Sequence, residues 1–298
     1  MLNAKLALIN SQSAMFRKLS VYLSFVRFSH SVFALPFALA GALLAARHGT
    51  LTWSAIGWIA VAMIAARSAA MGFNRLTDAR LDALNPRTEN RELPRGTISA
   101  REAIWFVIIA SIVFISAAWR LGPLCLALSP VALAIVFWYS LAKRYTTWTQ
   151  MFLGLAMAVA PVGGWLAAGG RGGWEPWLLG LAIGTWIGGF DILYACQDLA
   201  FDRVHGLRSV PVRFGVPRSL AISRVMHLVA VVCLFALSWV TPLPRFYQAG
   251  VGAVAVLLGY EQSLVRADDL SQVKRAFDMN GYVGILYLLV LAASIYGG

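Results

Sequence analysis

Apolar and polar residues alternate along this chain in long blocks. Stretches of about 17–25 mostly apolar residues can cross a membrane as a helix, and they recur down to the C-terminal end with short polar segments between them. The pattern predicts nine spans, at residues 31–47, 51–73, 102–119, 121–141, 148–169, 174–197, 218–240, 246–265 and 278–296. The expected fold class is all-α, a polytopic bundle of nine transmembrane helices.

Composition agrees with this pattern. Of the 298 residues, 59% are hydrophobic and 13% are charged, with a mean hydropathy of +0.71, whereas soluble domains carry about 25% charged residues. No separate soluble domain is expected, and residues 1–298 are interpreted as one integral-membrane domain. The segment 14–28 mixes basic and apolar residues, which is typical of an amphipathic helix at the membrane surface. The alternative is an extension of the first span.

Basic residues predict the orientation in the membrane. Of the 25 Lys and Arg residues, 20 lie before the first span or in every second connection. Because positive charge favours the cytoplasmic side, the N-terminus is expected there, with the active site facing the cytoplasm. The net charge of +12 is then explained by topology and by contact with anionic lipid or a diphosphate, so no nucleic-acid partner is predicted.

Two polar motifs, NRLTDARLD and DILYACQDLAFD, lie at cytoplasmic ends of predicted spans. At 100° per residue, the acids of each motif share one helix face to within about 40°. Facing acids cannot all stay charged without cations between them, and Mg²⁺ held partly by a substrate phosphate is the natural partner. The candidate ligands are Asn74, Asp78, Asp82, Asp191, Asp198 and Asp202.

Each motif is followed by a basic connection, 74–101 in the first case and 198–217 in the second. This similarity predicts two pseudo-repeated halves, about 1–145 and 146–298, whose motifs face each other across a central cavity.

Three basic or phenolic residues are candidates for phosphate contact. Arg67 lies inside a span, where a charge usually marks a polar cavity; the alternative is an ion pair with Asp191. Tyr139 and Lys143 are four residues apart at a helix end. They are suited to one phosphate, or they are an interfacial tyrosine and a lysine reaching for water.

The connection 74–101 repeats arginine every four residues, and Arg87 is the candidate for phosphate binding. Asp191 lies deepest in its motif, where it could hold a metal, orient an acceptor or take a proton, and Tyr194 follows one turn later. Glu261 and Asp278 are interpreted as structural residues. The three cysteines and four histidines show no metal-ligand spacing.

In order along the chain, NxxxDxxxD, RTxxR, YSxxKR, DxxYAxxDxxxD and SxPxRFG resemble the UbiA family of intramembrane prenyltransferases. The resemblance covers nearly the whole chain. Within the family it is strongest to bacterial 4-hydroxybenzoate polyprenyltransferases and their relatives in menaquinone synthesis. Here the first motif reads Asn74-Arg75 where many relatives have Asn-Asp.

The resemblance implies nine helices around a cavity open to lipid, located in the bacterial inner (plasma) membrane. It also implies transfer of a prenyl group from a prenyl diphosphate to a small aromatic acid, with Mg²⁺ as cofactor. Carried over to this chain, the metal ligands are Asn74, Asp78, Asp82, Asp198 and Asp202. The diphosphate contacts are Arg67, Arg87, Tyr139, Lys143 and Tyr194. The catalytic residues are Asp191, Asp198 and Arg67.

Alternatives remain open. A dihydroxynaphthoate of menaquinone synthesis, a haem or chlorophyll precursor, or a glycerol-phosphate lipid could replace 4-hydroxybenzoate as the acceptor. A proton-coupled transporter would place isolated charges near the membrane midplane, and a phosphatidyl-type transferase would carry a different acidic motif. Neither pattern fits. The sequence does not indicate the prenyl chain length or the oligomeric state.

Overall fold

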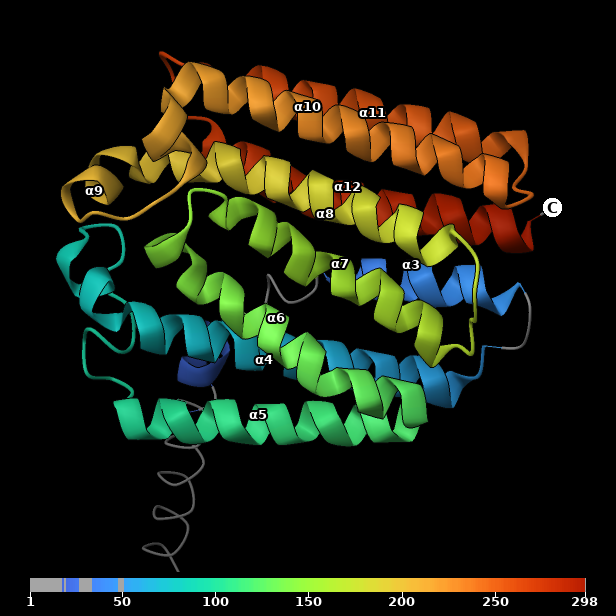
Figure 1. The fold of residues 1–298 in the computed structure, drawn as a ribbon, viewed down its shortest axis with the longest axis horizontal. Helices are drawn as coiled ribbons and strands as arrows, with labels where there is room; N and C mark the ends of the chain where they lie inside the picture. Colours follow the sequence, from blue (N-terminus) through green and yellow to red (C-terminus); the bar gives the residue numbers. More distant parts are fainter. Residues whose placement is uncertain (1–17, 19, 27–33, 48–50, 298) are drawn as a thin grey trace, which may run out of the picture.

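Helices make up all the regular structure in the part of the chain that is described. A computed structural model describes residues 18, 20–26, 34–47 and 51–297, and none of these residues forms a strand. The long helices run side by side along one axis (Figure 1). The predicted all-α class is therefore confirmed. Of the predicted surface helix 14–28, residues 18 and 20–26 are described, and residues 20–25 are helical, whereas the other residues lie outside the described part of the chain.

Hydroxyl side chains mark several helix starts. The Thr52 hydroxyl accepts a hydrogen bond from the Ala55 N–H at 3.2 Å, and Ser99 forms a capping box with Glu102. The elements are α3 (Leu35–Ala46), α4 (Trp53–Leu84), α5 (Ala100–Leu121), α6 (Pro123–Tyr145), α7 (Thr149–Ala167), α8 (Glu175–Ala195), the 3₁₀ turn η1 (Cys196–Asp198), α9 (Leu199–Val204), α10 (Val210–Val240), α11 (Arg245–Leu264) and α12 (Val273–Tyr296).

Every predicted span coincides with a helix. Among the described residues, seven helical segments are long and apolar enough to cross a membrane. The other two predicted spans fall on α3, which has 12 residues, and on α11, which does not meet that standard. An integral membrane protein is thus supported, whereas the count of nine spans, the orientation and the two pseudo-repeated halves stay predictions.

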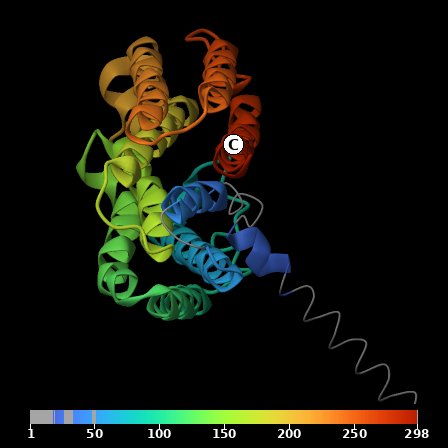
Figure 2. The same ribbon diagram turned by 90° about the vertical axis from the view of Figure 1, so that its right-hand side faces the viewer.

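Small residues let the central helices approach each other. Figure 2 shows α3, α7 and α8 between a group formed by α10, α11 and α12 and a group formed by α4, α5 and α6. A Cβ atom at Gly41 of α3 would overlap the backbone of Pro161 in α7, and one at Gly164 of α7 would overlap the backbone of Ala38. Close contact of this kind is how helices pack in membranes, where lipid removes the hydrophobic drive between them.

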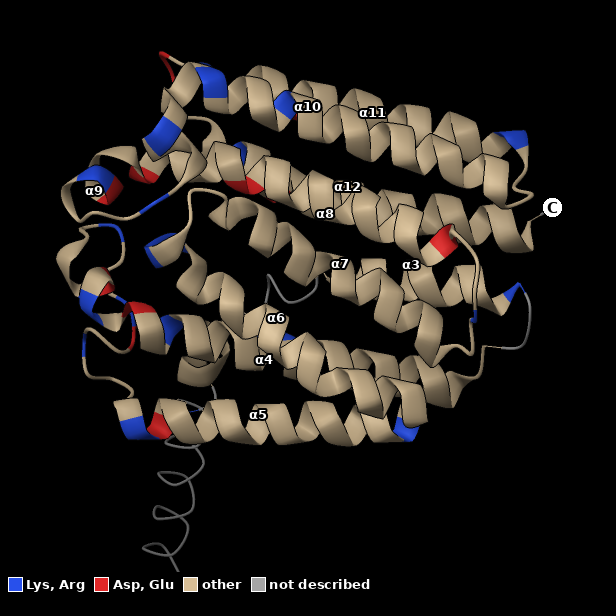
Figure 3. Ribbon diagram, in the orientation of Figure 1, with Lys and Arg blue, Asp and Glu red and all other residues tan. Residues whose placement is uncertain are grey.

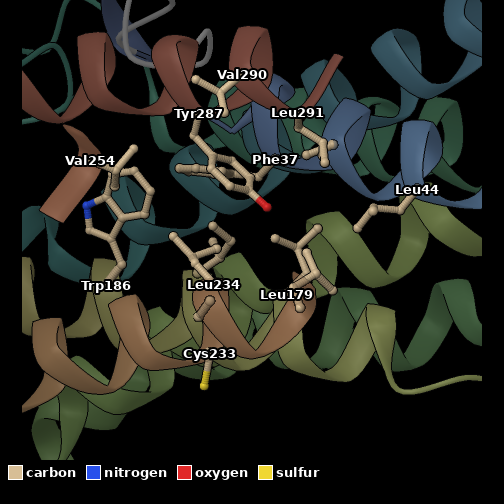
Figure 4. Close-up of a cluster of buried hydrophobic side chains, with 14 of the residues drawn as sticks. Phe37, Leu44, Leu179, Trp186, Cys233, Leu234, Val254, Tyr287, Val290 and Leu291 are labelled. Atoms are coloured by element: carbon tan, nitrogen blue, oxygen red, sulfur yellow. The ribbon is translucent and has the colours of Figure 1, made fainter. Parts of the chain in front are cut away.

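The main apolar core lies where α3 and α8 meet α10, α11 and α12. Figure 4 shows Phe37, Trp186, Leu234 and Tyr287 converging there. The Phe37 and Trp186 rings meet edge to face with centroids 5.4 Å apart. This core fixes the position of α8, which carries the second acidic motif.

Two boundaries differ from the prediction. The span 51–73 continues as α4 to Leu84, so the first motif is helical rather than part of the connection 74–101. The connection 198–217 is also mostly helical, because α9 lies in it and α10 begins at Val210. Gly215, with a φ of 74°, interrupts α10 in front of Pro217. Both differences arise because polar residues end an apolar window without ending the helix.

Candidate active site

The first motif forms a buried stripe at the end of α4. The side chain of Asp78 is 5% exposed and accepts hydrogen bonds from Lys143 Nζ at 2.6 Å and Arg144 at 2.9 Å. Asn74, one turn earlier, donates to Asp78 at 3.4 Å. Arg144 also donates to the Thr77 carbonyl at 2.6 Å. The stripe therefore joins α4 to the end of α6.

The connection after α4 folds back over this stripe. The Asn85 side chain accepts a hydrogen bond from the Arg87 N–H at 2.9 Å, a local turn that fixes the start of the connection. One turn further, Arg91 donates to both carboxylate oxygens of Asp82, at 2.7 and 2.8 Å. Asp82, in the last turn of α4, thus pairs with a residue of the connection that follows this helix.

Arg87 links the first motif to the second. Its guanidinium donates to both oxygens of Asp198, at 3.1 and 2.5 Å, and to the Tyr194 hydroxyl at 2.8 Å. Burial favours the neutral form of this guanidinium, but the charge of Asp198 and the contact with Tyr194 outweigh it, so the pKa of Arg87 is raised. Because Arg87 and Asp198 are 111 residues apart, this contact holds the two predicted halves together.

The second motif follows a break in its helix. Asp191 lies in α8, Asp198 closes the 3₁₀ turn η1, and Asp202 lies in α9. The change of helix type alters the predicted single face of the three acids, since a 3₁₀ turn winds more tightly than an α-helix. Even so, the charge of Asp198 acts on both other aspartates.

Arg67 and Tyr139 complete the site on its membrane side. They interact electrostatically with each other, and Tyr139 also interacts with Asp191 and Asp78. Lys143 acts on Asp191 and on Asp202. All the predicted site residues therefore come together at one end of the bundle, where Figure 3 shows acidic and basic residues gathered around α9 and the connection after α4. Their individual roles stay predictions.

An apolar cavity of about 790 Å³ extends from this site into the bundle. Arg67 and Tyr139 are on its wall. Nearly all other lining residues are apolar, and they come mainly from α4, α6, α7 and α8, with others from α3, α5 and α10. Val131, Leu155 and Leu181 line the cavity and are solvent-accessible. The cavity is not fully enclosed, and its apolar lining suits a long hydrocarbon chain.

Sequence reasoning did not single out Arg144 or the pairing of Arg91 with Asp82. In the structure, basic side chains pair with Asp78, Asp82 and Asp198. The divalent cations expected between the acids stay a prediction. The position of Arg144 beside Lys143 at the end of α6 was the available signal. Lys143 and Arg144 of α6 both reach the carboxylate of Asp78 because this side chain of α4 faces the end of α6.

An apolar helical bundle with a charged site next to an apolar cavity defines an integral membrane protein suited to bind a molecule with a charged head and an apolar tail. The family model of the UbiA prenyltransferase family matches residues 34–287. The chain belongs to this family, and the predicted resemblance is confirmed.

Named relatives agree with this assignment. The chain is 30% identical to a 4-hydroxybenzoate octaprenyltransferase of Vibrio campbellii over 255 residues, which are 86% of this chain and 89% of the relative. The apo structure of a UbiA homolog from Aeropyrum pernix is 33% identical with a TM-score of 0.81, covering 88% of this chain and 96% of that one. A UbiA homolog from Archaeoglobus fulgidus bound to GPP and Mg²⁺ shares the fold, with 19% identity, a TM-score of 0.76 and coverage of 92% and 99%.

Proposed function

We propose that this protein transfers a polyprenyl group from a prenyl diphosphate to a ring carbon of 4-hydroxybenzoate, in the inner membrane with its site facing the cytoplasm. The observation that carries the proposal is the junction of a basic site with an apolar cavity at Arg67 and Tyr139. A prenyl diphosphate has the same two parts, a charged head and an apolar tail. The acceptor is inferred from the name of the Vibrio relative.

The diphosphate is assigned to the basic and phenolic side chains. Arg67, Tyr139 and Lys143 would hold it from the membrane side, and Arg87 with Tyr194 from the connection above. Arg87 and Lys143 now pair with Asp198 and Asp78. A diphosphate offers Arg87 a bidentate contact and Lys143 a charged oxygen, as the carboxylates do now. We infer that both basic residues leave their carboxylates and bind the substrate.

Asp78 and Asp198, released in this way by Lys143 and Arg87, suit Mg²⁺ together with the other predicted ligands. Asn74, Asp78, Asp82, Asp198 and Asp202 supply the hard oxygen donors that Mg²⁺ prefers. Among the described residues no three acidic, histidine or cysteine side chains are close enough to hold one ion. Mg²⁺ that is bound through a phosphate group uses one or two carboxylates and completes its shell with phosphate and water. Bound Mg²⁺ would supply charge stabilisation for the departing diphosphate.

The reaction needs cleavage of the allylic C–O bond, with the electron pair leaving on the diphosphate. Arg67, Arg87 and Lys143 would stabilise the charge that builds there. The acceptor ring then forms the new C–C bond with the allylic carbon, and the ring proton must leave. Asp191, at the inner edge of the site, is assigned to orient the phenol or take that proton. The apolar cavity would exclude water, which would otherwise capture the allylic cation.

A product assay tests the function. Purified protein is incubated with geranyl diphosphate and Mg²⁺, with 4-hydroxybenzoate or 1,4-dihydroxy-6-naphthoate offered separately, and products are identified by mass spectrometry. We expect a prenylated benzoate that EDTA abolishes. A prenylated naphthoate alone would keep the chemistry and replace the acceptor. Failure of both acceptors, including with a longer prenyl donor, would contradict the proposed acceptor class.

Arg87 offers a separate test of the diphosphate assignment. We expect Arg87→Ala to raise KM for the prenyl diphosphate roughly tenfold or more, because a bidentate charged contact is lost. Initial rates at varied donor concentration measure it. Arg95→Ala is the matched control, since Arg95 is exposed in the same connection, and its KM should stay within about twofold of wild type. Equal effects of the two changes would show a nonspecific loss of positive charge.

A further inference from the structure

A second polar group lies buried between α8, α10, α11 and α12. Glu261 is 0% exposed and Gln262 is 8% exposed. Gln262 donates to Ser223 at 2.8 Å and contacts His227 Nδ1 at 3.1 Å. Asn280 accepts from the indole N–H of Trp186 at 2.6 Å. We call these residues the Glu261 group; Figure 4 shows Trp186 among the residues of the apolar core.

Hydrogen-bond donors in the Glu261 group are almost used up. His227 Nε2 lies 3.1 Å from the Trp186 carbonyl, which can only accept, so Nε2 carries the proton and Nδ1 accepts from Gln262. The Ser223 hydroxyl donates to the Gly189 carbonyl at 2.6 Å. One N–H of Asn280 contacts the Ala276 carbonyl at 3.3 Å, and its other N–H is the one donor left.

Acceptors, by contrast, are in excess. Three buried oxygens have no hydrogen-bond partner within the described part of the chain. They are both carboxylate oxygens of Glu261 and the side-chain oxygen of Gln262. Asn280 is close enough to act on the Glu261 carboxyl, but a single N–H cannot satisfy three oxygens. Unsatisfied buried acceptors are costly. The Glu261 group therefore lacks a hydrogen-bond donor or a cation that would satisfy these oxygens.

Among the described residues, no basic side chain is in contact with the Glu261 carboxylate. From α10 the titratable neighbour is His227, held neutral by its two contacts. On α12, Lys274, Arg275 and Asp278 are exposed, and Arg275 contacts the Tyr260 hydroxyl of α11. On α8 the acid is Asp191, about 140° around the helix from Trp186. An isolated ionised carboxylate is not stable in such surroundings.

The Glu261 group is also separate from the candidate active site. Gly184 lines the apolar cavity, and Asp191 lies seven residues later on the same face of α8, within about 20°. Trp186 and the Gly189 carbonyl face α10 and α12 instead. α8 therefore stands between two polar sites, one on each side.

We propose that the Glu261 group binds a single monovalent cation, either Na⁺ coordinated by the free oxygens or a proton carried by Glu261. Either cation neutralises the carboxylate and uses the excess acceptors. This proposal does not depend on prenyl transfer. Cation binding to the Glu261 group is expected to stabilise the packing of α11 and α12 against α8.

The test is modification of the purified full-length protein by dicyclohexylcarbodiimide, which adds to protonated carboxyl groups in apolar surroundings, with the site located by peptide mass spectrometry. If Na⁺ is the ligand, labelling of Glu261 should fall about tenfold when NaCl at ten times its Kd replaces choline chloride. If a proton is the ligand, NaCl should have no effect, and labelling should fall about tenfold per pH unit once the carboxyl titrates.

Thermal unfolding of variants provides a second measurement. We expect the melting temperature of the wild type to rise with Na⁺ in the first case and with falling pH in the second. Glu261→Gln keeps the shape of the side chain and leaves His227 unchanged. This variant should lose the dependence of the melting temperature on Na⁺ or on pH. Asp278→Asn, which removes an exposed acid nearby on α12, should keep it. Absence of Glu261 labelling, together with equal Na⁺ and pH responses in wild type and Glu261→Gln, would overturn the proposal.

Discussion

Replacing Asp78 by asparagine is expected to lower the turnover of prenyl transfer by about 10²–10³-fold. Asp78 is the acid of the first motif that two basic residues contact, Lys143 and Arg144. Its side chain is 5% exposed, so water cannot replace the missing charge. Under the proposed function, this change also removes a Mg²⁺ ligand where the diphosphate leaves. The measurement is kcat at saturating donor and acceptor.

Loss of activity must be separated from loss of folding, because Lys143 and Arg144 would be left without their carboxylate. The melting temperature with and without prenyl diphosphate and Mg²⁺ distinguishes the two. We expect Asp78→Asn to keep its basal melting temperature within a few degrees but to lose the shift caused by substrate. Asp268→Asn, at an exposed acid outside the site, serves as the control. Near-normal kcat in Asp78→Asn would refute the ligand assignment.

Sequence predicted the helices well because membrane insertion depends on a local property. A run of apolar residues must be helical to satisfy its backbone in lipid, so each predicted span coincides with a helix. The prediction was wrong at the end of the second span, where α4 continues through Asn74 to Leu84. Hydropathy reports where lipid ends, whereas a helix ends at a residue such as Asn85 with extended backbone.

The gathering of the acids was also predictable, because the motif spacings follow helical periodicity. Their partners were not. The contact of Arg87 with Asp198 depends on how two distant connections fold over each other. The pairing of Arg91 with Asp82 depends on a turn after α4. Spacing along one helix contains no information about either.

Glu261 illustrates a different limit. As an acid near a predicted helix end, it was interpreted as structural, and the same reasoning applied to Asp278. The structure separates them, since Glu261 is fully buried and Asp278 is exposed. Helical periodicity alone did not indicate which of two neighbouring polar residues, Glu261 or Gln262, would be enclosed. Both are enclosed because α10 and α12 pack on either side of α11.

Asp191→Asn is expected to lower kcat by about 10²-fold or more, with KM for the prenyl diphosphate changed by less than about threefold. Asp191 lies on the cavity face of α8, inside Asp198, and interacts with Lys143 and Tyr139. Asparagine keeps the size of the side chain but can neither accept the ring proton nor orient the phenol with a negative charge. Steady-state rates with each substrate varied in turn measure both constants.

The split between the two constants decides the role of Asp191. A group that acts on the acceptor should leave the donor-dependent shift in melting temperature intact while product formation falls. A group that binds Mg²⁺ or diphosphate should lose that shift together with activity, as expected for Asp78→Asn. If Asp191→Asn raises KM for the donor and leaves kcat near wild type, Asp191 belongs with the diphosphate ligands, and the ring proton must leave to another acceptor such as the departing diphosphate.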